Sequence, residues 1–288
     1  MNISAFLADR TTITEKALDR LVPSETTLPV AIHKAMRYSL FAGGKRIRPA
    51  LCFAASEAIG GHCPGIENVA ATLEMIHTYS LIHDDLPALD NDDLRRGRPT
   101  NHKVFGEAMA ILAGDSLLTL AFEVLGKLGN AHLVVELATA SGTVGGMIGG
   151  QVEDIQGEGQ PATAELLDRI HRAKTGALLR ASVRMGAIYA GAAGPQLAAL
   201  SSYGEHVGLA FQIVDDILDV EQSSEALGKT AGKDAAQQKI TFPAVYGLEP
   251  SRQMAARELE LAHAAVTQFG EKADPLKAIA DLIVHRKA

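Results

Sequence analysis

Apolar residues recur at three- and four-residue spacing along most of this chain, and that period limits its fold more than any other feature. Near the C-terminus Gly270 stops one such run, whose apolar positions are Ala255, Leu259, Ala262, Val266 and Phe269. No segment alternates convincingly with period two and no Asn-Gly hairpin signal occurs, so strands are not expected. Aromatic residues make up 5% of the chain and Trp is absent, which suits closely packed helices better than sheets. We therefore predict an all-α protein.

Three polar segments interrupt the helical pattern, but none resembles a linker between domains. They contain Gly or Pro and cover residues 86–101, 156–162 and 221–238. The charged motifs on either side of them look chemically interdependent, and no short repeat of the solenoid type occurs. We expect one all-α domain over residues 1–288.

Charge and cysteine content exclude several classes of function. A formal net charge of −7 provides no basic field that would attract nucleic acid or an anionic membrane surface. Cys52 and Cys63 lack metal-ligand spacing and are too few for a disulfide framework, so a reducing cytoplasm is expected. The N-terminus shows no signal-peptide pattern. The longest uncharged stretch, residues 185–204, has Gly and Pro near its middle, which predicts a helix–turn–helix rather than a membrane span.

The first chemically informative segment, residues 83–97, packs five carboxylates and two guanidiniums together. Pro87 should end the helix that carries Asp84 and Asp85, leaving the other acids on a loop at the negative end of that helix. Crowded carboxylates at such an end need cations, and hard oxygen ligands favour Mg²⁺. A solvated acidic loop is the alternative. An EF-hand is excluded because Leu94 and Arg95 occupy the fifth and sixth positions of a loop starting at Asp90.

A second acidic segment, residues 211–219, reads as pure helix. Its polar face carries Gln212, Asp215, Asp216 and Asp219, and its other face is apolar. An ordinary exposed acidic face is one interpretation, but the flanking sequence is strongly apolar, so this face is expected to line a cavity. Two such clusters would let two helices hold several Mg²⁺ ions around one diphosphate.

With both clusters in order, the chain resembles the trans-isoprenyl diphosphate synthases, the polyprenyl synthetase family, and within it the bacterial-type farnesyl diphosphate synthases. The resemblance runs from Gly-Gly-Lys-Arg-Ile-Arg-Pro at residues 43–49 to Ile-Thr-Phe-Pro at 240–243, nearly the whole chain. The first cluster matches DDxxxxD at Asp84, Asp85 and Asp90. The second matches DDxxD at 215–219, and RRG, KTG and GKxxGKD are present as well. The resemblance implies a large helical bundle around a central cavity.

The resemblance also implies ligands for two or three Mg²⁺ ions. Asp84, Asp90 and Asp215 would be the principal ligands, and the set would be completed by Asp85, Asp216 and Asp219. These ions would bridge the diphosphate of an allylic substrate, dimethylallyl or geranyl diphosphate. Such a leaving group departs only when its developing charge is neutralised, which metals and guanidiniums do in a dry cavity.

The resemblance also implies that the cationic residues are divided between two substrates. Contacts to the allylic diphosphate would come from Arg95, Lys174, Lys229 and Lys239. Isopentenyl diphosphate, the second substrate, would be bound by Lys45, Arg48, His77 and Arg96. Solvated surface cations are the alternative for each of these, and an ordinary structural histidine is the alternative for His77. For Lys103, Lys233 and Arg98, a functional role and a solvated surface position are given equal weight. No role is assigned to Glu74 or Arg286.

The mechanism implied is ionisation, condensation and elimination, with no Ser/His/Asp nucleophile. Lys174 and Thr175, near an expected helix break at Gly176, and Gln212 resemble the groups that stabilise the allylic carbocation. In the family a bulky residue five positions before the first cluster forms a floor that limits product length. Tyr79 occupies that position, and the small Ser80 follows it. The bacterial-type pattern combines such an aromatic with the two-residue insertion seen before Asp90, so the resemblance implies fifteen-carbon farnesyl diphosphate as the product. Tyr79 as an ordinary core residue is the alternative.

Three other functions occur among proteins of this kind, and the same residues bear on each of them. Geranylgeranyl or geranyl diphosphate synthesis uses the same chemistry with a different product. A class I terpene cyclase ionises one substrate and has no need of Lys45, Arg48 and the Arg95–Arg96 pair. A non-catalytic partner subunit would tolerate loss of motif aspartates, and all six are present here. By family resemblance a homodimer is expected, and His83 is expected to be structural.

Overall fold

The computed structural model describes residues 2–61, 63–221 and 239–286, and this part of the chain is almost entirely helical, which confirms the predicted fold class. Its α-helices are α1 (Ile3–Leu21), α2 (Val30–Leu40), α3 (Ile47–Gly60), α4 (Ile66–Asp84), α5 (Asn101–Phe105), α6 (Glu107–Lys127), α7 (Ala131–Ser141), α8 (Met147–Gly157), α9 (Ala164–His171), α10 (Ala177–Tyr189), α11 (Gly194–Glu221), α14 (Phe242–Tyr246), α15 (Leu248–Ala265) and α16 (Asp274–Val284). A π-helical turn, η1 (Arg172–Gly176), joins α9 to α10, and a 3₁₀ segment, η2 (Thr267–Ala273), precedes α16.

One short hairpin departs from the expectation that no strands occur. Strands β1 (Leu94–Arg95) and β2 (Arg98–Pro99) pair antiparallel, with Leu94 opposite Pro99. Arg96 and Gly97 between them have φ of 54° and 72°, the left-handed conformation that a two-residue hairpin turn requires. Two residues per strand are too few for an alternating pattern, so the sequence carried no periodic signal for this element.

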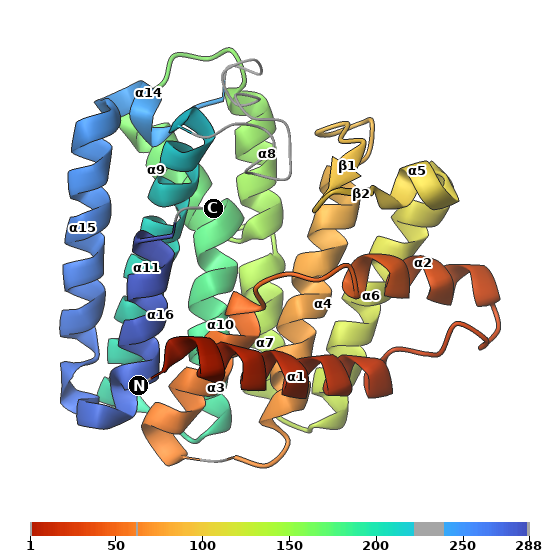
Figure 1. Ribbon diagram of the computed structural model, residues 1–288, viewed down its shortest axis with the longest axis horizontal. Helices are drawn as coiled ribbons and strands as arrows, with labels where there is room; N and C mark the ends of the chain where they lie inside the picture. The colour runs from red at the N-terminus through yellow and green to blue at the C-terminus, as the bar shows by residue number, and fades with distance from the viewer. Residues whose placement is uncertain (1, 62, 222–238, 287–288) are drawn as a thin grey trace.

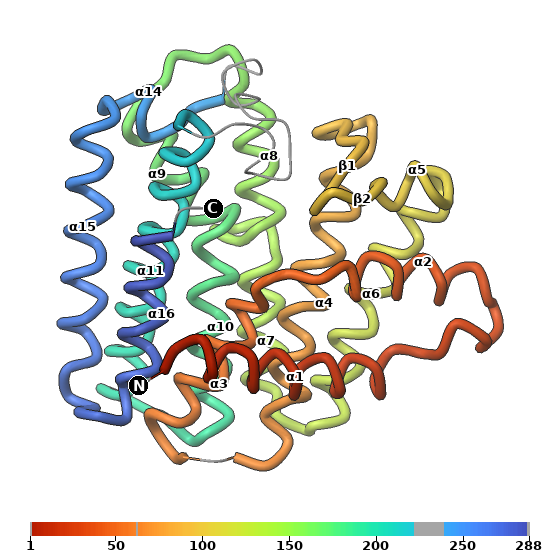
Figure 2. The backbone as a smooth tube through the Cα atoms, in the orientation of Figure 1, coloured from red at the N-terminus to blue at the C-terminus, as the bar shows by residue number. Residues whose placement is uncertain are grey.

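The helices stand largely side by side, and α1 crosses in front of several of them (Figure 1). The tube in Figure 2 shows α11, α15 and α16 gathered on one side and α4 and α6 on the other, with α8 and α10 between them. Leu73, Ile76, Leu117 and Leu125 are fully buried where α4 and α6 pack together. A second buried cluster joins α3, α10, α11 and α16. The core therefore fixes the position of α4 and α11, the two helices that carry the aspartate clusters.

Small residues allow the closest helix contacts. A side chain on Gly186 would overlap the carbonyl oxygen of Cys52, so α10 can pack directly on α3 only because position 186 is glycine. The uncharged stretch 185–204 is indeed two helices, because α10 ends at Tyr189 and α11 begins at Gly194.

One described helix, α6, has the length and apolar composition needed to cross a membrane. It packs against α4 and α2 within the bundle. Core helices of globular proteins meet the same length and composition criteria, so α6 carries no argument for a membrane span.

Candidate active site

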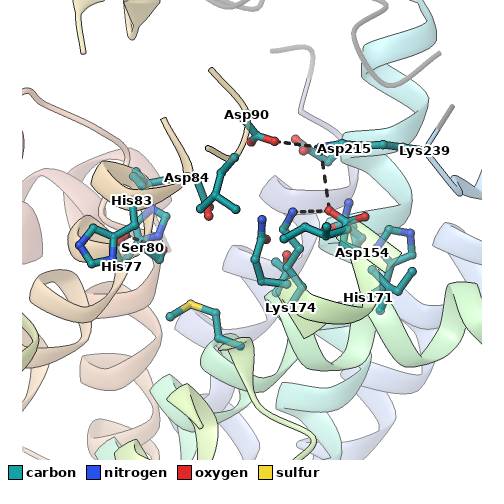
Figure 3. Close-up of a pocket in the computed structure, with 18 of the residues that line it drawn as sticks. His77, Ser80, His83, Asp84, Asp90, Asp154, His171, Lys174, Asp215 and Lys239 are labelled. Carbon is teal, nitrogen blue, oxygen red and sulfur yellow. Dashed lines mark hydrogen bonds and ion pairs between the residues drawn. The ribbon is translucent and has the colours of Figure 1, made fainter. Parts of the chain in front are cut away.

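One cavity of about 640 Å³ opens among α4, the loop that follows it, α8, η1 and α11. Asp84, at the end of α4, and Asp215, on α11, both line this cavity, so the two aspartate clusters share a single site. Figure 3 shows Lys174 and Asp154 across the cavity from Asp84, with Asp90 and Lys239 above them in the view.

The wall formed by α4 presents a carboxylate, Asp84, whose charged form is less favourable than that of an ordinary aspartate. The pKa of Asp84 is raised to about 6, chiefly by burial and also by the nearby carboxylate of Asp90, while Lys174 opposes the shift. The backbone also draws the acids together, because the amide of Asp90 donates a 2.8 Å hydrogen bond to the carbonyl of Asp84. This end of α4 is thus a site where an added cation relieves an unfavourable concentration of negative charge.

Asp85 points elsewhere. Nε and Nη2 of Arg95 lie 2.7 and 2.6 Å from its Oδ1 atom, and the residue is 3% exposed. Asp85 is absent from the residues that line the cavity, whereas Arg95 is among them. The expected metal ligand Asp85 is therefore committed to Arg95 in this structure, which fixes the guanidinium at the edge of the cavity.

On the wall formed by α11, Asp215 and Asp216 both line the cavity, but their side chains have different partners. Asp215 faces the cavity and accepts a 3.1 Å hydrogen bond from Arg286. Asp216 is 3% exposed and accepts hydrogen bonds from the Gln212 amide at 2.8 Å and the Phe242 backbone amide at 2.9 Å. Asp216 thus ties α11 to the segment entering α14. Asp219, one turn further along α11, also lines the cavity.

The buried carboxylate of Asp154 lies close to both lysines that are found in the cavity lining among the described residues. Nζ of Lys174 donates a 2.6 Å hydrogen bond to Asp154 on α8, and Nζ of Lys239 lies 3.9 Å from the same Oδ2 atom. Lys239 also donates a 3.3 Å hydrogen bond to Asp90, so it links the α4 loop to α8. Gly150 lets α8 approach η1 this closely, because a side chain there would overlap the backbone of Lys174.

Lys174 and Thr175 belong to η1, where a helix break was expected. The chain instead continues from α9 through one π-helical turn into α10 without interruption. Such turns are frequent at functional sites because the extra residue shifts side chains out of the regular register. Here Lys174, Thr175 and Gln212 all line the cavity.

A cationic region forms the third side. Its members Arg48, His77 and Arg96 line the cavity, whereas Lys45 is exposed and lies outside its lining. Burial lowers the pKa of Arg48 to about 10, with Glu74 opposing the shift. Burial also lowers the pKa of His77 well below its ordinary value, and Arg48 and Arg96 add to the effect, so His77 is neutral at pH 7. The guanidiniums make this region suited to a polyanion.

Apolar side chains complete the cavity beneath Asp84. Tyr79 is 5% exposed and lines the cavity, and its ring meets that of His83 edge-on with centroids 5.8 Å apart. Ser80 lines it as well and donates its own hydroxyl to the His77 carbonyl at 2.9 Å. Met147 and Ile148 contribute from α8.

No ready-made metal cage exists in the parts of the chain that the structure describes, since no three His, Cys, Asp or Glu side chains there are spaced to hold an ion. The cavity acids lie on two walls. A hard divalent cation held by them would therefore take further oxygen ligands from a molecule lying between the walls, as Mg²⁺ commonly does with phosphates.

The sequence model of the polyprenyl synthetase family matches residues 29–282 of this chain. The chain belongs to that family. The heterodimeric geranylgeranyl pyrophosphate synthase large subunit 1 of Arabidopsis thaliana is 48% identical over 98% of this chain and 79% of its own length. Farnesyl diphosphate synthase of Geobacillus stearothermophilus is 44% identical over 99% of this chain and 98% of its own. A polyprenyl synthase from Caulobacter crescentus, crystallised with calcium and isoprenyl diphosphate, superposes with a TM-score of 0.90 at 27% identity, covering 99% of this chain and 97% of that chain.

This polyprenyl synthetase is accordingly a trans-prenyl diphosphate synthase, a prenyltransferase of isoprenoid biosynthesis, in a family that uses divalent metal. Its resemblance to the family, stated above from motifs, is confirmed. Lys229 and Lys233 lie outside the described residues. Two further cations are placed away from the cavity: Lys103 pairs with Asp93 at 3.0 Å, and the Arg98 guanidinium lies 4.6 Å from the ring centre of Tyr38.

Three residues of the synthase site carry no motif that sequence reasoning used. Asp154 lies beside Glu153 on α8 and matches no motif, and Gln151 is three residues earlier on the same helical face. Arg286 reaches Asp215 from the C-terminal segment, far away in sequence. His83, expected to be structural, lines the cavity and lies 3.0 Å from the Ile111 carbonyl oxygen.

Proposed function

We propose that this enzyme condenses isopentenyl diphosphate with dimethylallyl and then geranyl diphosphate, in a Mg²⁺-dependent reaction, to give (2E,6E)-farnesyl diphosphate. The observation that carries the proposal is that Asp84 and Asp215 line one cavity from different helices. Carboxylates on two walls can hold divalent ions against a diphosphate between them, whereas acids on separate surfaces cannot.

The residues present fit two or three Mg²⁺ ions. Asp84, Asp90, Asp215 and Asp219 offer hard oxygen donors within the cavity lining. Asp85, whose Oδ1 accepts from Arg95, and Asp216, both of whose oxygens accept hydrogen bonds, support the site by fixing Arg95 and Gln212. Bound ions would neutralise the charge that develops on the departing diphosphate. The raised pKa of Asp84 indicates the same need for a cation at this end of α4.

The distribution of lysines and arginines supports one diphosphate on each side of the cavity. Lys174, Lys239 and Arg95 surround the metal side and would bind the allylic diphosphate, together with Lys229 by family resemblance. Arg48, His77 and Arg96 form the cationic region that would bind isopentenyl diphosphate, together with Lys45, which lies outside the cavity lining. A neutral His77 can donate one hydrogen bond without adding charge. A terpene cyclase, which ionises a single diphosphate substrate, has no use for this second region.

The reaction breaks the bond between the allylic carbon and its diphosphate oxygen and leaves an allylic carbocation. The double bond of isopentenyl diphosphate supplies the electron pair for the new carbon–carbon bond, and a proton is then lost to the departed diphosphate. Thr175 and Gln212, which line the cavity beside Lys174, would stabilise the cation through their oxygen dipoles.

Product length is proposed from Tyr79. This ring lies about 7–8 Å below Asp84 along the axis of α4 and lines the cavity, so it can stop a growing chain at fifteen carbons. Geranylgeranyl diphosphate is the second candidate, because relatives named as its synthases are 45% to 48% identical to this chain, against 44% for the farnesyl relative. Those identities are too similar to separate the products.

A homodimer in the cytoplasm completes the proposal. Large apolar side chains are exposed along α6 and α7, among them Ile111, Leu112 and Val135 at 45%, 53% and 62%. A second copy could cover them. Both cysteines are free, as in a reducing compartment.

The test is incubation of the purified enzyme with isopentenyl and dimethylallyl diphosphates, with Mg²⁺ or with EDTA, followed by mass analysis of the dephosphorylated alcohol. We expect a fifteen-carbon alcohol with Mg²⁺ and none with EDTA. A twenty-carbon alcohol would assign the geranylgeranyl product instead. No condensation under either condition would reject the reaction.

A further inference from the structure

A buried ion pair lies directly behind the cationic region and has no part in the mechanism above. Arg46 is 3% exposed and Glu74 is 2% exposed, and Nη1 of Arg46 donates a 2.9 Å hydrogen bond to Oε1 of Glu74. Neither residue is among those that line the cavity. A buried pair of this kind is costly unless every hydrogen bond is made, so its presence calls for an explanation beyond stability.

Arg46 makes its remaining hydrogen bonds to two further elements. Nε donates to Glu15 of α1 at 2.8 Å, and Nη2 donates to the carbonyl of Leu40, the last residue of α2, at 2.6 Å. Glu74 lies on α4. One guanidinium therefore ties three helices to the residue that caps the start of α3.

The loop held in this way has an unusual backbone. Gly43, Gly44 and Arg46 have φ of 84°, 130° and 47°, so three of four consecutive residues are in the positive-φ region. A non-glycine residue in that region costs about 1–2 kcal/mol and persists only when its surroundings hold it there. The three hydrogen bonds of Arg46 supply that constraint.

The same loop positions most of the cations proposed for isopentenyl diphosphate. Lys45 precedes Arg46 and Arg48 follows it by two residues. Arg96 donates a hydrogen bond to the Gly43 carbonyl, and a side chain on Gly44 would come within 2.8 Å of the Arg96 guanidinium. Movement of residues 43–46 would therefore displace Lys45, Arg48 and Arg96 together.

We propose that Glu74 is a positioning residue for isopentenyl diphosphate: by holding Arg46 it fixes the 43–46 loop in the geometry that places Lys45, Arg48 and Arg96 around that diphosphate. This inference rests on the proposed assignment of the cationic region to the second substrate. Glu74 acts only through Arg46 and touches no substrate, since it lies outside the cavity lining.

A pure charge effect predicts the opposite sign. Glu74 interacts electrostatically with Arg48 and Arg96 as well as with Arg46. Removing one negative charge beside an anion site, with the geometry unchanged, strengthens anion binding. Losing the loop geometry weakens it. The direction of the change in KM for isopentenyl diphosphate thus separates the two roles.

The experiment compares wild type with Glu74→Gln, which keeps the side-chain shape and removes the charge. We expect KM for isopentenyl diphosphate to rise on the order of tenfold, because misplaced contacts lose most of their binding energy. KM for geranyl diphosphate should stay within about twofold. The matched control is Glu57→Gln, the same change on α3 roughly 15 Å from its start, where Glu57 pairs with Arg10 at 2.7 Å. Its KM values should equal those of wild type.

Two additions make every outcome decisive. Glu15→Gln removes the other carboxylate that contacts Arg46, at a position whose side chain is 32% exposed. This variant should also raise KM for isopentenyl diphosphate, and it provides the test should Glu74→Gln fail to fold. Calorimetric titration with isopentenyl diphosphate measures its dissociation constant in the absence of turnover. An unchanged or lower KM and dissociation constant in both variants would overturn the inference, even where wild type makes product. Absence of product with wild type would reject the proposed reaction instead, and absence of isopentenyl diphosphate binding by wild type would reject both.

Discussion

The Nζ atom of Lys174 lies 2.6 Å from the Oδ2 atom of Asp154. The same carboxylate lies 3.9 Å from Lys239, so one buried acid on α8 fixes two cations that face the aspartates of α4. These lysines can meet a diphosphate without first being ordered, which is the condition for electrostatic catalysis in a cavity.

Asp154→Asn should therefore lower kcat with geranyl diphosphate by on the order of tenfold to a hundredfold, because Lys174 and Lys239 lose the group that holds them in place. Steady-state kinetics measures this. Glu153→Gln is the matched control, since Glu153 is the neighbouring acid on α8 and pairs with Arg169 at 3.1 Å. Equal kcat values for the two variants would remove Asp154 from the site.

Tyr79→Ala should lengthen the product beyond fifteen carbons, because it removes the ring that lines the cavity and is proposed to stop the growing chain. Mass analysis of the dephosphorylated alcohols measures the product distribution. Tyr79→Phe is the control: the hydroxyl is buried without a hydrogen-bond partner, so its loss should leave both product length and stability nearly unchanged. A fifteen-carbon product from Tyr79→Ala would mean that another wall sets the length.

Gly114→Ala should disturb the end of α4 from the opposite helix. A side chain at position 114 of α6 would overlap the imidazole of His83, the residue directly before Asp84. We expect a loss of about 1–3 kcal/mol in the free energy of unfolding, as for other overpacked sites, together with lower activity.

The control for that change lies on the same helix. A side chain on Gly126 would meet nothing within 4 Å, and a helical Gly→Ala change there should add about 0.5–1 kcal/mol of stability. Urea unfolding of both variants measures the difference. Equal effects of the two alanines would show that His83 does not constrain α4.

The neutral state of His77 predicts a specific pH dependence. Its folded-state pKa is lowered, so the unfolded chain binds the proton more strongly. The stability contributed by this group is complete above the unfolded pKa of 6.5 and is lost as pH falls below that value.

Without ligand, His77→Gln should lose less unfolding free energy than wild type between pH 6.5 and pH 5.5. Urea unfolding at pH 7.5, 6.5 and 5.5 measures how the free energy of unfolding of each protein changes with pH. His132→Gln, which replaces an exposed imidazole on α7, should follow the wild-type profile. A His77→Gln profile parallel to wild type would indicate that the folded protein protonates His77 normally.

The parts of the site that could be predicted from the sequence are those where spacing alone decides the geometry. Asp215 and Asp219 share a helical face because they are four residues apart, and Pro87 ends the helix that carries Asp84. The cavity between them depends on how α4, α8 and α11 pack, but two acid clusters flanked by apolar sequence were enough to expect it.

Other parts required the packed structure. Asp154 carries no motif, and its role arises from the approach of α8 to η1 over Gly150. Asp85 matches the metal motif, yet the short hairpin brings Arg95 to it, and two residues per strand leave no periodic trace in the sequence. Tyr79 is five residues from Asp84, a rotation that would place the two on different faces of α4. Both nevertheless line the cavity.

The central claim is that Asp84 and Asp215 hold metal ions against one diphosphate, and a crystal structure with Mg²⁺ and inorganic pyrophosphate tests it most directly. The account predicts pyrophosphate between the two walls, with at least one ion contacting Asp84 and at least one contacting Asp215, and each ion also bound to a phosphate oxygen. Pyrophosphate bound at one wall alone, with the other aspartate cluster taking no part in its metal coordination, would contradict it.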